Sequence, residues 1–392
     1  MKSLVICIAV LFLFGCEKDR VLPPAFYSCG DEIPGSPADH PKNGAYEALV
    51  NSIVSKGLPG MQLSVRDNAN GRWNGALGYA DLASGAGMQP CHMTRAGSTV
   101  KTFTAATILL LQEEGILSID EPVTDYLTAD QLSGIENAGS STIRQLLNHS
   151  SGIYNYIQSA QFQTASLNDL TKVWYPHELL EYARGRASYF RPGTDVLYSN
   201  TNYVLLGMII EEATGRPFYE VFEDKIFTPL QMTYTGFAAT DPVPDGIVRG
   251  YVDFYSNRDL INSTHYSGWD YYTADGGLIS NAHDLALFLH ALINGDLLSA
   301  ESLAQMLAWQ EPNELPEEGF RTGYGLGIFK IETEHGPAYL HSGDAIGYFA
   351  TMVHFPEHNV TVSWTVNGNY GKLDEYTQSK EAMERVFDTV LD

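Results

Sequence analysis

A serine and a lysine stand three residues apart at Ser98 and Lys101, at the start of an apolar run. Residues three apart on a helix share one face, so the lysine amine can reach the serine hydroxyl without movement of a loop. A lysine serves as the base for a serine nucleophile when burial and the positive end of a helix favour its neutral form. The spacing therefore predicts a serine acyl-transfer site in which Ser98 attacks and Lys101 accepts its proton.

The residues around this pair predict a buried central helix. Gly97, directly before Ser98, suits a loop that makes a close approach as it enters a helix. The following positions are apolar nearly all round, as shown by Phe103, Ala105, Ala106, Ile108, Leu109 and Leu111. Glu113-Glu114 then mark the solvated end of the helix. About one Ser-x-x-Lys spacing is expected by chance in a chain of this length, so the site needs support from other parts of the sequence.

A second polar cluster, Tyr198-Ser199-Asn200, stands directly before a predicted helix over Thr201 to Thr214. Tyr198 is a candidate to relay the proton from the nucleophile to the leaving group, and Asn200 is a candidate to orient a substrate amide. A second copy of the tripeptide, Tyr255-Ser256-Asn257, lies in a polar stretch with no apolar helix after it. The copy that contains Tyr198 is therefore the favoured one.

A third cluster, His341-Ser342-Gly343, is expected where one strand ends against its neighbour. A glycine at this place lets a substrate backbone lie close. An oxyanion hole needs two backbone N–H groups, and Ser98 and Asp344 are the candidates to supply them. Taken alone, His341 is a strand-end histidine hydrogen-bonded for structural reasons, so its assignment to the substrate depends on the other two clusters.

Asp344 bears on the choice of substrate. A carboxylate within a few ångströms of the acid end of a peptide repels it by about 1 to 4 kcal/mol. If the Asp344 side chain points into the site, we expect a substrate that is neutral or cationic at that end, such as an ester or a peptide amide. Lys330, on a predicted neighbouring strand, is either a cation that offsets this repulsion or a solvated strand lysine.

In this order the three clusters resemble the motifs of the serine β-lactamase and penicillin-binding-protein superfamily, in particular its class C and D-alanyl-D-alanine carboxypeptidase-like branch. The resemblance runs from about Gly44 to Asn369. Its further landmarks are Thr94-Arg95-Ala96-Gly97 before Ser98, Thr142 to Gly152, Phe190-Arg191-Pro192-Gly193, Ala274 to Ser280 and Tyr324-Gly325-Leu326-Gly327. Several independent matches in the right order make the resemblance specific.

The resemblance implies a role for each matched residue. Ser98 corresponds to the nucleophile, Lys101 to its base and Tyr198 to the acid/base partner. The implied substrate-binding residues are Asn200, His341, Ser342 and Gly343. No metal or cofactor is implied. The third motif begins with histidine where class C β-lactamases have lysine. A histidine at this position is similar to family carboxypeptidases and D-amino-acid peptidases, and it does not favour efficient β-lactam turnover.

The implied fold is α+β and β-lactamase-like, with an antiparallel five-stranded sheet flanked by helices and a mostly helical subdomain over roughly residues 116–280. Apolar alternation predicts strands over Met61 to Val65, Trp73 to Tyr79, Tyr324 to Ile331, Tyr348 to Phe355 and Val360 to Val366. Residues 376–391 predict a closing amphipathic helix. The first and last strands must then pair across the chain in one sheet, within a single catalytic domain over 43–392.

The N-terminus resembles a bacterial lipoprotein signal. Lys2 precedes an apolar stretch from Leu4 to Phe14, and Cys16 follows as the expected lipidated first residue of the mature protein. As an uncleaved anchor the stretch is too short to span a membrane. We therefore expect a signal peptide over 1–15 and a lipidated, proline-rich tether over 16–42. These features predict an exported lipoprotein of the bacterial cell envelope, anchored to the membrane in the periplasm or at the cell surface.

Two cysteines, Cys29 and Cys91, remain after the signal and the lipidated residue are set aside. In an oxidising compartment they are expected to form a disulfide that pins the tether to the loop before Ser98, with two free thiols as the alternative. The formal net charge of −24 argues against nucleic-acid binding. The chain lacks a Gly-x-Ser-x-Gly elbow, and His177-Glu178-Leu179-Leu180-Glu181 lacks the second histidine of a zincin helix.

We therefore expect an exported, monomeric serine hydrolase that forms an acyl-enzyme on Ser98 and acts on D-amino-acid peptides or related amides and esters. Its expected partner is a small-molecule or peptide substrate, such as a peptidoglycan stem peptide or a β-lactam. An esterase and a weak class C-like β-lactamase are the nearest alternatives. The alternative from another class is a penicillin-recognising sensor that acylates without turnover.

Overall fold

A computed structural model describes residues 29, 33, 37–266, 268–314 and 319–392. The predicted signal peptide over 1–15 and Cys16 lie outside these residues, as does most of the predicted tether over 16–42. Among the described residues, no helix combines the length and the apolar character needed to cross a membrane.

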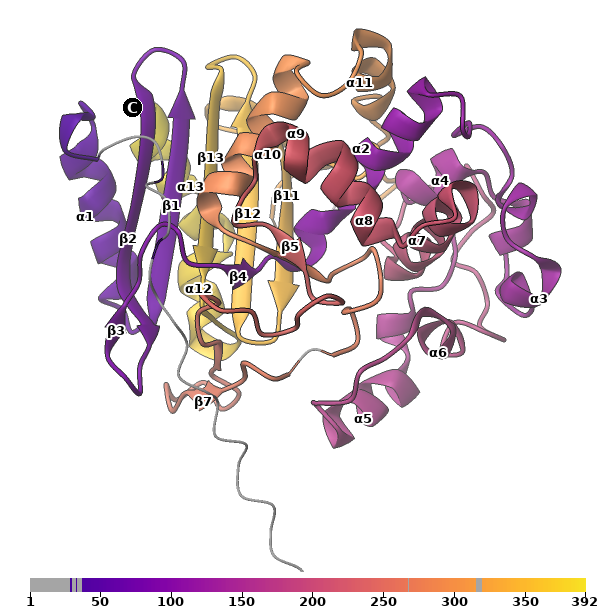
Figure 1. Cartoon of the computed structure of the whole chain (residues 1–392), viewed down its shortest axis with the longest axis horizontal. Helices are drawn as coiled ribbons and strands as arrows, with labels where there is room; N and C mark the ends of the chain where they lie inside the picture. Colours follow the sequence, from indigo (N-terminus) through magenta and orange to yellow (C-terminus); the bar gives the residue numbers. More distant parts are fainter. Residues whose placement is uncertain (1–28, 30–32, 34–36, 267, 315–318) are drawn as a thin grey trace, which may run out of the picture.

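An antiparallel sheet of eight strands, in the order β3-β2-β1-β13-β12-β11-β10-β9, organises the fold (Figure 1). Its strands are β1 (Gly60–Asp67), β2 (Gly71–Asp81), β3 (Ala86–Gly87), β9 (Thr322–Tyr324), β10 (Phe329–Thr333), β11 (Gly336–Ala345), β12 (Tyr348–Phe355) and β13 (Val360–Val366). The N-terminal strand β1 pairs with β13 near the C-terminus, with Met61 opposite Val366. The first and last strands therefore share one sheet, as the sequence predicted.

The α+β class is confirmed, but the sheet has eight strands where five were expected. One reason is that the predicted strand over Tyr324 to Ile331 is divided into β9 and β10. Gly327, between them, has a φ of +64°, which an extended strand does not allow. The third motif also lies differently, because β11 continues to Ala345 and so contains His341 to Gly343 in its interior.

Helices cover both faces of the sheet. Two helices, α1 (Asn43–Val54) and α13 (Lys380–Leu391), share one hydrophobic cluster with the strands. On the other face, α10 (Ala282–Asn294) contacts β1, β12 and β13. This double coverage explains why every residue of β12 and β13 is buried.

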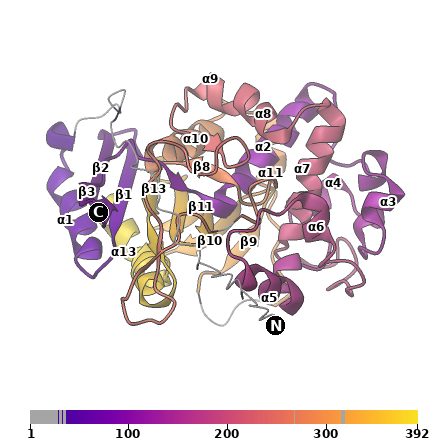
Figure 2. The ribbon, with the colours of Figure 1, turned by 60° about the horizontal axis from the view of Figure 1, so that its bottom comes forward.

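The segment between residues 96 and 281 forms a mostly helical region that lies away from β1 and β2. Figure 2 shows α1 and α13 on one side of the sheet strands and α3, α4 and α7 on the other. The helices here are α2 (Val100–Glu113), α3 (Ala129–Leu132), α4 (Ile143–Leu147), α5 (Ala160–Asn168), α6 (Pro176–Leu180), α7 (Asn200–Thr214), α8 (Phe218–Phe222) and α9 (Thr228–Leu230), with α11 (Ala300–Met306) and α12 (Asp374–Thr377) farther on. Two small sheets pair β4 (Thr94–Arg95), β8 (Leu278–Ser280) and β5 (Gly236–Phe237), and β14 (Gly368–Asn369), β6 (Tyr251–Val252) and β7 (Ile261–Asn262).

Helix α2 is the structural centre, since nearly all of its residues are buried. Phe103 stacks on Phe288 of α10 with ring centroids 3.6 Å apart, which joins α2 to the helix that covers the sheet. The buried apolar residues of α2 belong to the largest hydrophobic cluster, together with residues of α4 and α7. Any side chain at the start of α2 is therefore held between the sheet and the helical region.

Candidate active site

Ser98 lies in a 3-10 turn, Gly97–Thr99, that leads directly into α2. Gly97 has a φ of +49°, and this turn runs against β11. A Cβ on Gly343 would lie 2.0 Å from the carbonyl oxygen of Ala96 and 2.6 Å from the backbone nitrogen of Ser98. The missing side chain of Gly343 therefore admits the turn that carries Ser98, and the close approach of a substrate backbone at this glycine stays a prediction.

Lys101 reaches Ser98 as the helical spacing predicted. Its Nζ donates a hydrogen bond to the Ser98 hydroxyl at 2.9 Å and another to the backbone carbonyl of Asp275. The Lys101 side chain has no exposed surface. Burial lowers the pKa of Lys101 to about 8, although the carboxylates of Asp275 and Asp270 act in the opposite direction. A useful fraction of this amine is therefore neutral near neutral pH.

Two buried carboxylates lie behind Lys101, and motif reasoning did not assign them a role. Asp275 accepts a hydrogen bond from the Tyr156 hydroxyl at 3.0 Å, and burial raises the pKa of its carboxyl. Burial also raises the pKa of Asp270 to about 7, against the opposing effect of the Arg95 guanidinium. The sequence signal was present, because Asp275 belongs to a stretch that resembles a family landmark.

Tyr198 lies on the other side of the serine. Its ring is 5.1 Å from the Lys101 Nζ, and Tyr198 and Ser98 line the same cavity. Burial raises the pKa of Tyr198 well above its ordinary value, so the phenol keeps its proton. The ring is held by His149, whose centroid lies 4.5 Å away and whose Nδ1 accepts a hydrogen bond from the Ser199 backbone.

His341 presents a neutral imidazole. It is 2% exposed, and its Nδ1 bonds the carbonyl oxygen of Ser342 at 2.7 Å. A carbonyl only accepts, so Nδ1 carries the proton and Nε2 is an acceptor that finds no partner among the described residues. Burial, followed by the nearby charge of Lys101, lowers the pKa of His341 to about 3. The third motif therefore contributes no positive charge at neutral pH.

Among the residues that the structure describes, the edge of β11 beside Ser98 has no neighbouring strand. β10 pairs with β11 only from Gly336 to Leu340, so the remainder has β12 on one side alone. Ala345 faces Tyr348 across a two-residue turn, and antiparallel pairs alternate between hydrogen-bonded and non-hydrogen-bonded kinds. Asp344 then occupies a non-hydrogen-bonded pair with its N–H directed away from β12, toward Ser98. The predicted oxyanion donors thus lie on facing segments.

A cavity of about 340 Å³ opens at this edge. It is lined by Ser98, Tyr198, Phe329, His341, Ser342, Asp344, Phe349, Gln378 and Met383. The structure therefore gathers residues of all three predicted clusters at one place. Gln378 and Met383, from the C-terminal segment, were not found from the sequence because no motif marks them.

Three other predicted residues have clear positions away from the cavity lining. Asn200 begins α7, and its side-chain amide donates to Asn155 Oδ1 at 3.4 Å, so within the described chain it does not line the cavity. Tyr255, of the second tripeptide copy, is 73% exposed. Lys330 pairs with Glu332 at 3.1 Å, which corresponds to the interpretation as an ordinary strand lysine.

Cys29 and Cys91 are joined by a disulfide, with their Cα atoms 5.7 Å apart. Together with His92 they make up the cluster of potential metal ligands found in the described part of the chain. Both sulfur atoms of that cluster are engaged in the disulfide, so they are not available as thiolate ligands.

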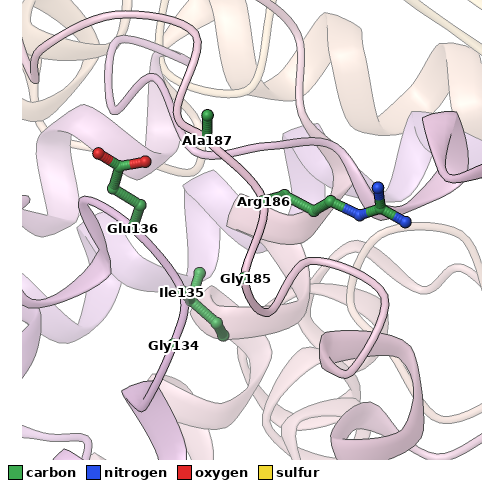
Figure 3. Close-up of a pocket in the computed structure, with 6 residues that line it drawn as sticks. All are labelled: Gly134, Ile135, Glu136, Gly185, Arg186 and Ala187. Carbon is green, nitrogen blue, oxygen red and sulfur yellow. The ribbon is translucent and has the colours of Figure 1, made fainter.

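A larger hollow of about 520 Å³ lies in the helical region and is lined by Gly134, Ile135, Glu136, Gly185, Arg186 and Ala187 (Figure 3). In the close-up, the Glu136 and Arg186 side chains point away from one another. Glu136 accepts a hydrogen bond from the Ser188 backbone, and Arg186 donates to Ser159 and Gln161. The hollow thus lacks converging reactive groups among the described residues, and the smaller cavity at Ser98 is the candidate site.

A serine bonded to a buried lysine, beside a phenol and the free edge of an antiparallel strand, is the arrangement of a lysine-assisted serine hydrolase. Comparison with protein families agrees, since the family model described as Beta-lactamase matches residues 44–383. The chain belongs to this family and is a serine hydrolase.

Two relatives illustrate the similarity. Penicillin-binding protein 4* of Bacillus subtilis strain 168 is 29% identical over 328 residues, which cover 81% of this chain and 68% of that protein. Protein flp of Staphylococcus aureus strain MW2 is 25% identical over 358 residues, which cover 88% of this chain and 67% of that protein.

Solved structures extend the comparison. A D-stereospecific amidohydrolase from a Streptomyces species superimposes with a TM-score of 0.74 and 30% identity, covering 86% of this chain and 98% of its own. The D-amino acid amidase of Ochrobactrum anthropi SV3, in complex with L-phenylalanine amide, gives a TM-score of 0.77 and 26% identity. The match covers 89% of this chain and 97% of the amidase chain. The fold class inferred from the sequence is confirmed by these structures.

Proposed function

We propose that this protein hydrolyses amide bonds of D-amino-acid compounds through an acyl-enzyme on Ser98. The observation that carries the proposal is the 2.9 Å contact between the Ser98 hydroxyl and the buried Lys101 amine. Burial lowers the pKa of that amine to about 8, so it can be neutral before it accepts a proton. Both requirements of an activated serine, a base within reach and a suitable protonation state, are then satisfied.

The proposed reaction has two halves. Lys101 takes the Ser98 proton as Oγ forms a bond to the carbonyl carbon, and the N–H groups of Ser98 and Asp344 stabilise the oxyanion. The C–N bond then breaks while the Tyr198 phenol donates a proton to the leaving nitrogen, and Lys101 returns a proton to the phenolic oxygen. In the second half, a water attacks the acyl carbon and gives a proton to Tyr198 and Lys101. The ester bond between the acyl carbon and Ser98 Oγ then breaks, Oγ takes up that proton, and the acid product leaves.

The substrate class is supported by the third motif and by the names of relatives. His341 is neutral, so it does not supply the cation that would hold the carboxylate of a penicillin or of a D-alanyl-D-alanine terminus. The Streptomyces and Ochrobactrum structures are an amidohydrolase and an amidase for D-amino-acid compounds. We therefore place D-amino-acid amides and peptides before β-lactams, and before C-terminal dipeptides, as substrates.

We also propose that the protein is an exported lipoprotein anchored through Cys16 at the cell envelope. The support is the N-terminal sequence, together with a disulfide between Cys29 and Cys91 that fits an oxidising compartment. Membrane fractionation of cells that express the natural chain and Cys16→Ser tests this proposal. Equal membrane association of the two proteins would contradict lipidation at Cys16.

Intact-mass spectrometry tests the acyl-enzyme. The mature chain and its Ser98→Ala variant are incubated in parallel with D-phenylalanine p-nitroanilide and with benzylpenicillin, and masses are recorded over time beside product release. We expect repeated turnover of the amide and a slowly cleared penicillin adduct, both absent from the Ser98→Ala variant. A single stoichiometric adduct without turnover would indicate a sensor, and turnover restricted to esters would indicate an esterase.

A further inference from the structure

Asp344 is an exposed residue that lines the cavity at Ser98, and its backbone N–H is the proposed oxyanion donor. The carbonyl oxygen of a bound substrate accepts a hydrogen bond from that N–H, and the carboxylate begins on the same residue. A substituent one or two bonds from the scissile carbon therefore lies within reach of this carboxylate, directly or through one water.

The groups that contact the Asp344 carboxylate are neutral. Oδ1 accepts hydrogen bonds from the amides of Asn369, at 3.2 Å, and Gln378, at 3.5 Å. Within the described chain, Oδ2 receives no hydrogen bond and neither oxygen forms a salt bridge. The charged group that influences Asp344 is Asp374, a second carboxylate. This carboxylate therefore has unsatisfied capacity for a donor.

In the described part of the chain, no lysine or arginine forms a salt bridge with the Asp344 carboxylate. Lys330 is paired with Glu332, and Lys101 is buried and bonded to Ser98. His341 is a neutral imidazole, as shown above. Asp344 is thus the one residue with a chargeable side chain, apart from His341 and Tyr198, among those that line the cavity in the described structure.

The remaining walls define the rest of the ligand. Phe329, Phe349 and Met383 give the cavity apolar surface beside the carboxylate. An apolar side chain on the same carbon as an ammonium group, as in a hydrophobic amino-acid amide, would satisfy both kinds of surface. Desolvation by the surrounding protein raises the pKa of the Asp344 carboxyl to about 6, which leaves it ionised at neutral pH.

We infer that Asp344 binds a cationic group of the substrate, a primary ammonium beside the scissile carbonyl, and that it rejects substrates with a carboxylate there. This inference rests on the proposed amide hydrolysis at Ser98 and narrows its substrate class. The enzyme then removes the residue that carries a free amino group, or hydrolyses its amide, and does not act on the acid end of a peptide.

A matched series of three substrates tests the inference: D-phenylalanine p-nitroanilide, its N-acetyl derivative and its N-succinyl derivative, in which the group at the α-nitrogen is cationic, neutral and anionic, respectively. The wild-type chain, Asp344→Asn and Glu375→Gln are compared. Glu375 is an exposed carboxylate of the same C-terminal region that does not line the cavity. We expect Asp344→Asn to lower the ratio of kcat/KM for cationic over anionic substrate by about 10-fold to 100-fold, and Glu375→Gln to leave it unchanged.

A second readout covers the case in which amide turnover is slow. Hydrolysis of p-nitrophenyl acetate, a neutral ester, reports on Ser98 independently of charge. Inhibition of that reaction by D-phenylalanine amide and by N-succinyl-D-phenylalanine amide then gives the charge preference as a ratio of Ki values. Asp344→Glu keeps the negative charge, so we expect this variant still to prefer the cationic inhibitor over the anionic one. A purely structural role of Asp344 would not require that result.

The outcomes separate the two proposals. If ester hydrolysis requires Ser98 but the ratio is the same in the wild type and Asp344→Asn, the role of Asp344 is overturned and the proposed function stands. The same conclusion follows if the wild type prefers the succinyl compound. If Ser98→Ala retains wild-type activity on every substrate, the proposed function itself fails.

Discussion

The Nζ atom of Lys101 lies 2.9 Å from the hydroxyl oxygen of Ser98, at a point where the lysine has no exposed surface. Helix geometry brings the two side chains to one face, and the packing of α2 against the sheet and the helical region removes water from the amine. The contact and the burial act together, because proximity alone would leave a protonated lysine that cannot accept a proton.

The first prediction concerns pH. Lys101 must be neutral to accept the Ser98 proton, so kcat/KM should increase as the pH rises through about 8, the pKa to which burial lowers this amine. A neutral ester is the suitable substrate, because its binding does not depend on Asp344. The measurement is a pH profile of kcat/KM from about pH 6 to pH 10. A profile that is flat across pH 8 would contradict the role of Lys101 as base.

The second prediction separates the two tyrosine tripeptides. Tyr198→Phe removes the phenol that lines the cavity beside Ser98, and we expect kcat for amide hydrolysis to fall by about 10²-fold to 10⁴-fold. Tyr255→Phe is the matched control, because Tyr255 is 73% exposed and does not line the cavity. Steady-state kinetics and thermal melting of both variants provide the measurement. Equal losses in the two variants would exclude a specific proton relay at Tyr198.

The third prediction concerns Gly343. A Cβ at this position would lie 2.0 Å from the Ala96 carbonyl oxygen, so Gly343→Ala must move either β11 or the turn that carries Ser98. We expect the free energy of unfolding to fall by about 1 to 3 kcal/mol, together with loss of activity. Gly87→Ala, where a Cβ meets no atom within 4 Å, is the control for adding a methyl group to a strand. Denaturant unfolding measures both variants, and a Gly343→Ala protein as stable and active as the control would refute the packing argument.

The fourth prediction assigns an electrostatic effect to Asp275. Its carboxylate raises the pKa of Lys101, in opposition to burial. Asp275→Asn should therefore lower the pKa of Lys101 and move the rising limb of the pH profile to lower pH. The exposed Asp130, substituted by Asn, is a control that should leave the limb in place. A shift to higher pH, or none, would show that the charge of Asp275 does not act on Lys101.

Much of the fold could be predicted because the pattern of apolar residues is local. The strands β12 and β13 have the same bounds that alternation predicted, and α7 begins one residue before the predicted helix. The prediction of a single strand over Tyr324 to Ile331 was wrong because Gly327 takes a positive φ within it. A glycine permits such a conformation without requiring it, so the sequence does not reveal where a strand is broken.

In the candidate site too, some residues could be predicted from motifs and others could not. Gln378 and Met383 reach the cavity only because the C-terminal segment packs near β11 and β12, and neither residue belongs to a motif. The role of Asn200 in orienting a substrate amide stays a prediction, and the contact of its side-chain amide with Asn155 was not indicated by any motif. The close packing of Gly343 against the turn that carries Ser98 was likewise not indicated by the sequence. In each case the contact joins segments that lie apart in the sequence, so no local pattern predicts it.

The identity and order of the reactive residues could be inferred from local sequence, because the contact between Ser98 and Lys101 follows from the pitch of one helix. The chemical state of those residues depends instead on how distant segments pack around them. The neutral imidazole of His341, the lowered pKa of Lys101 and the exposure of Asp344 each depend on which segments exclude water from the group. Helical spacing is set by bonds between near neighbours, whereas burial is set by segments that lie far apart in the chain.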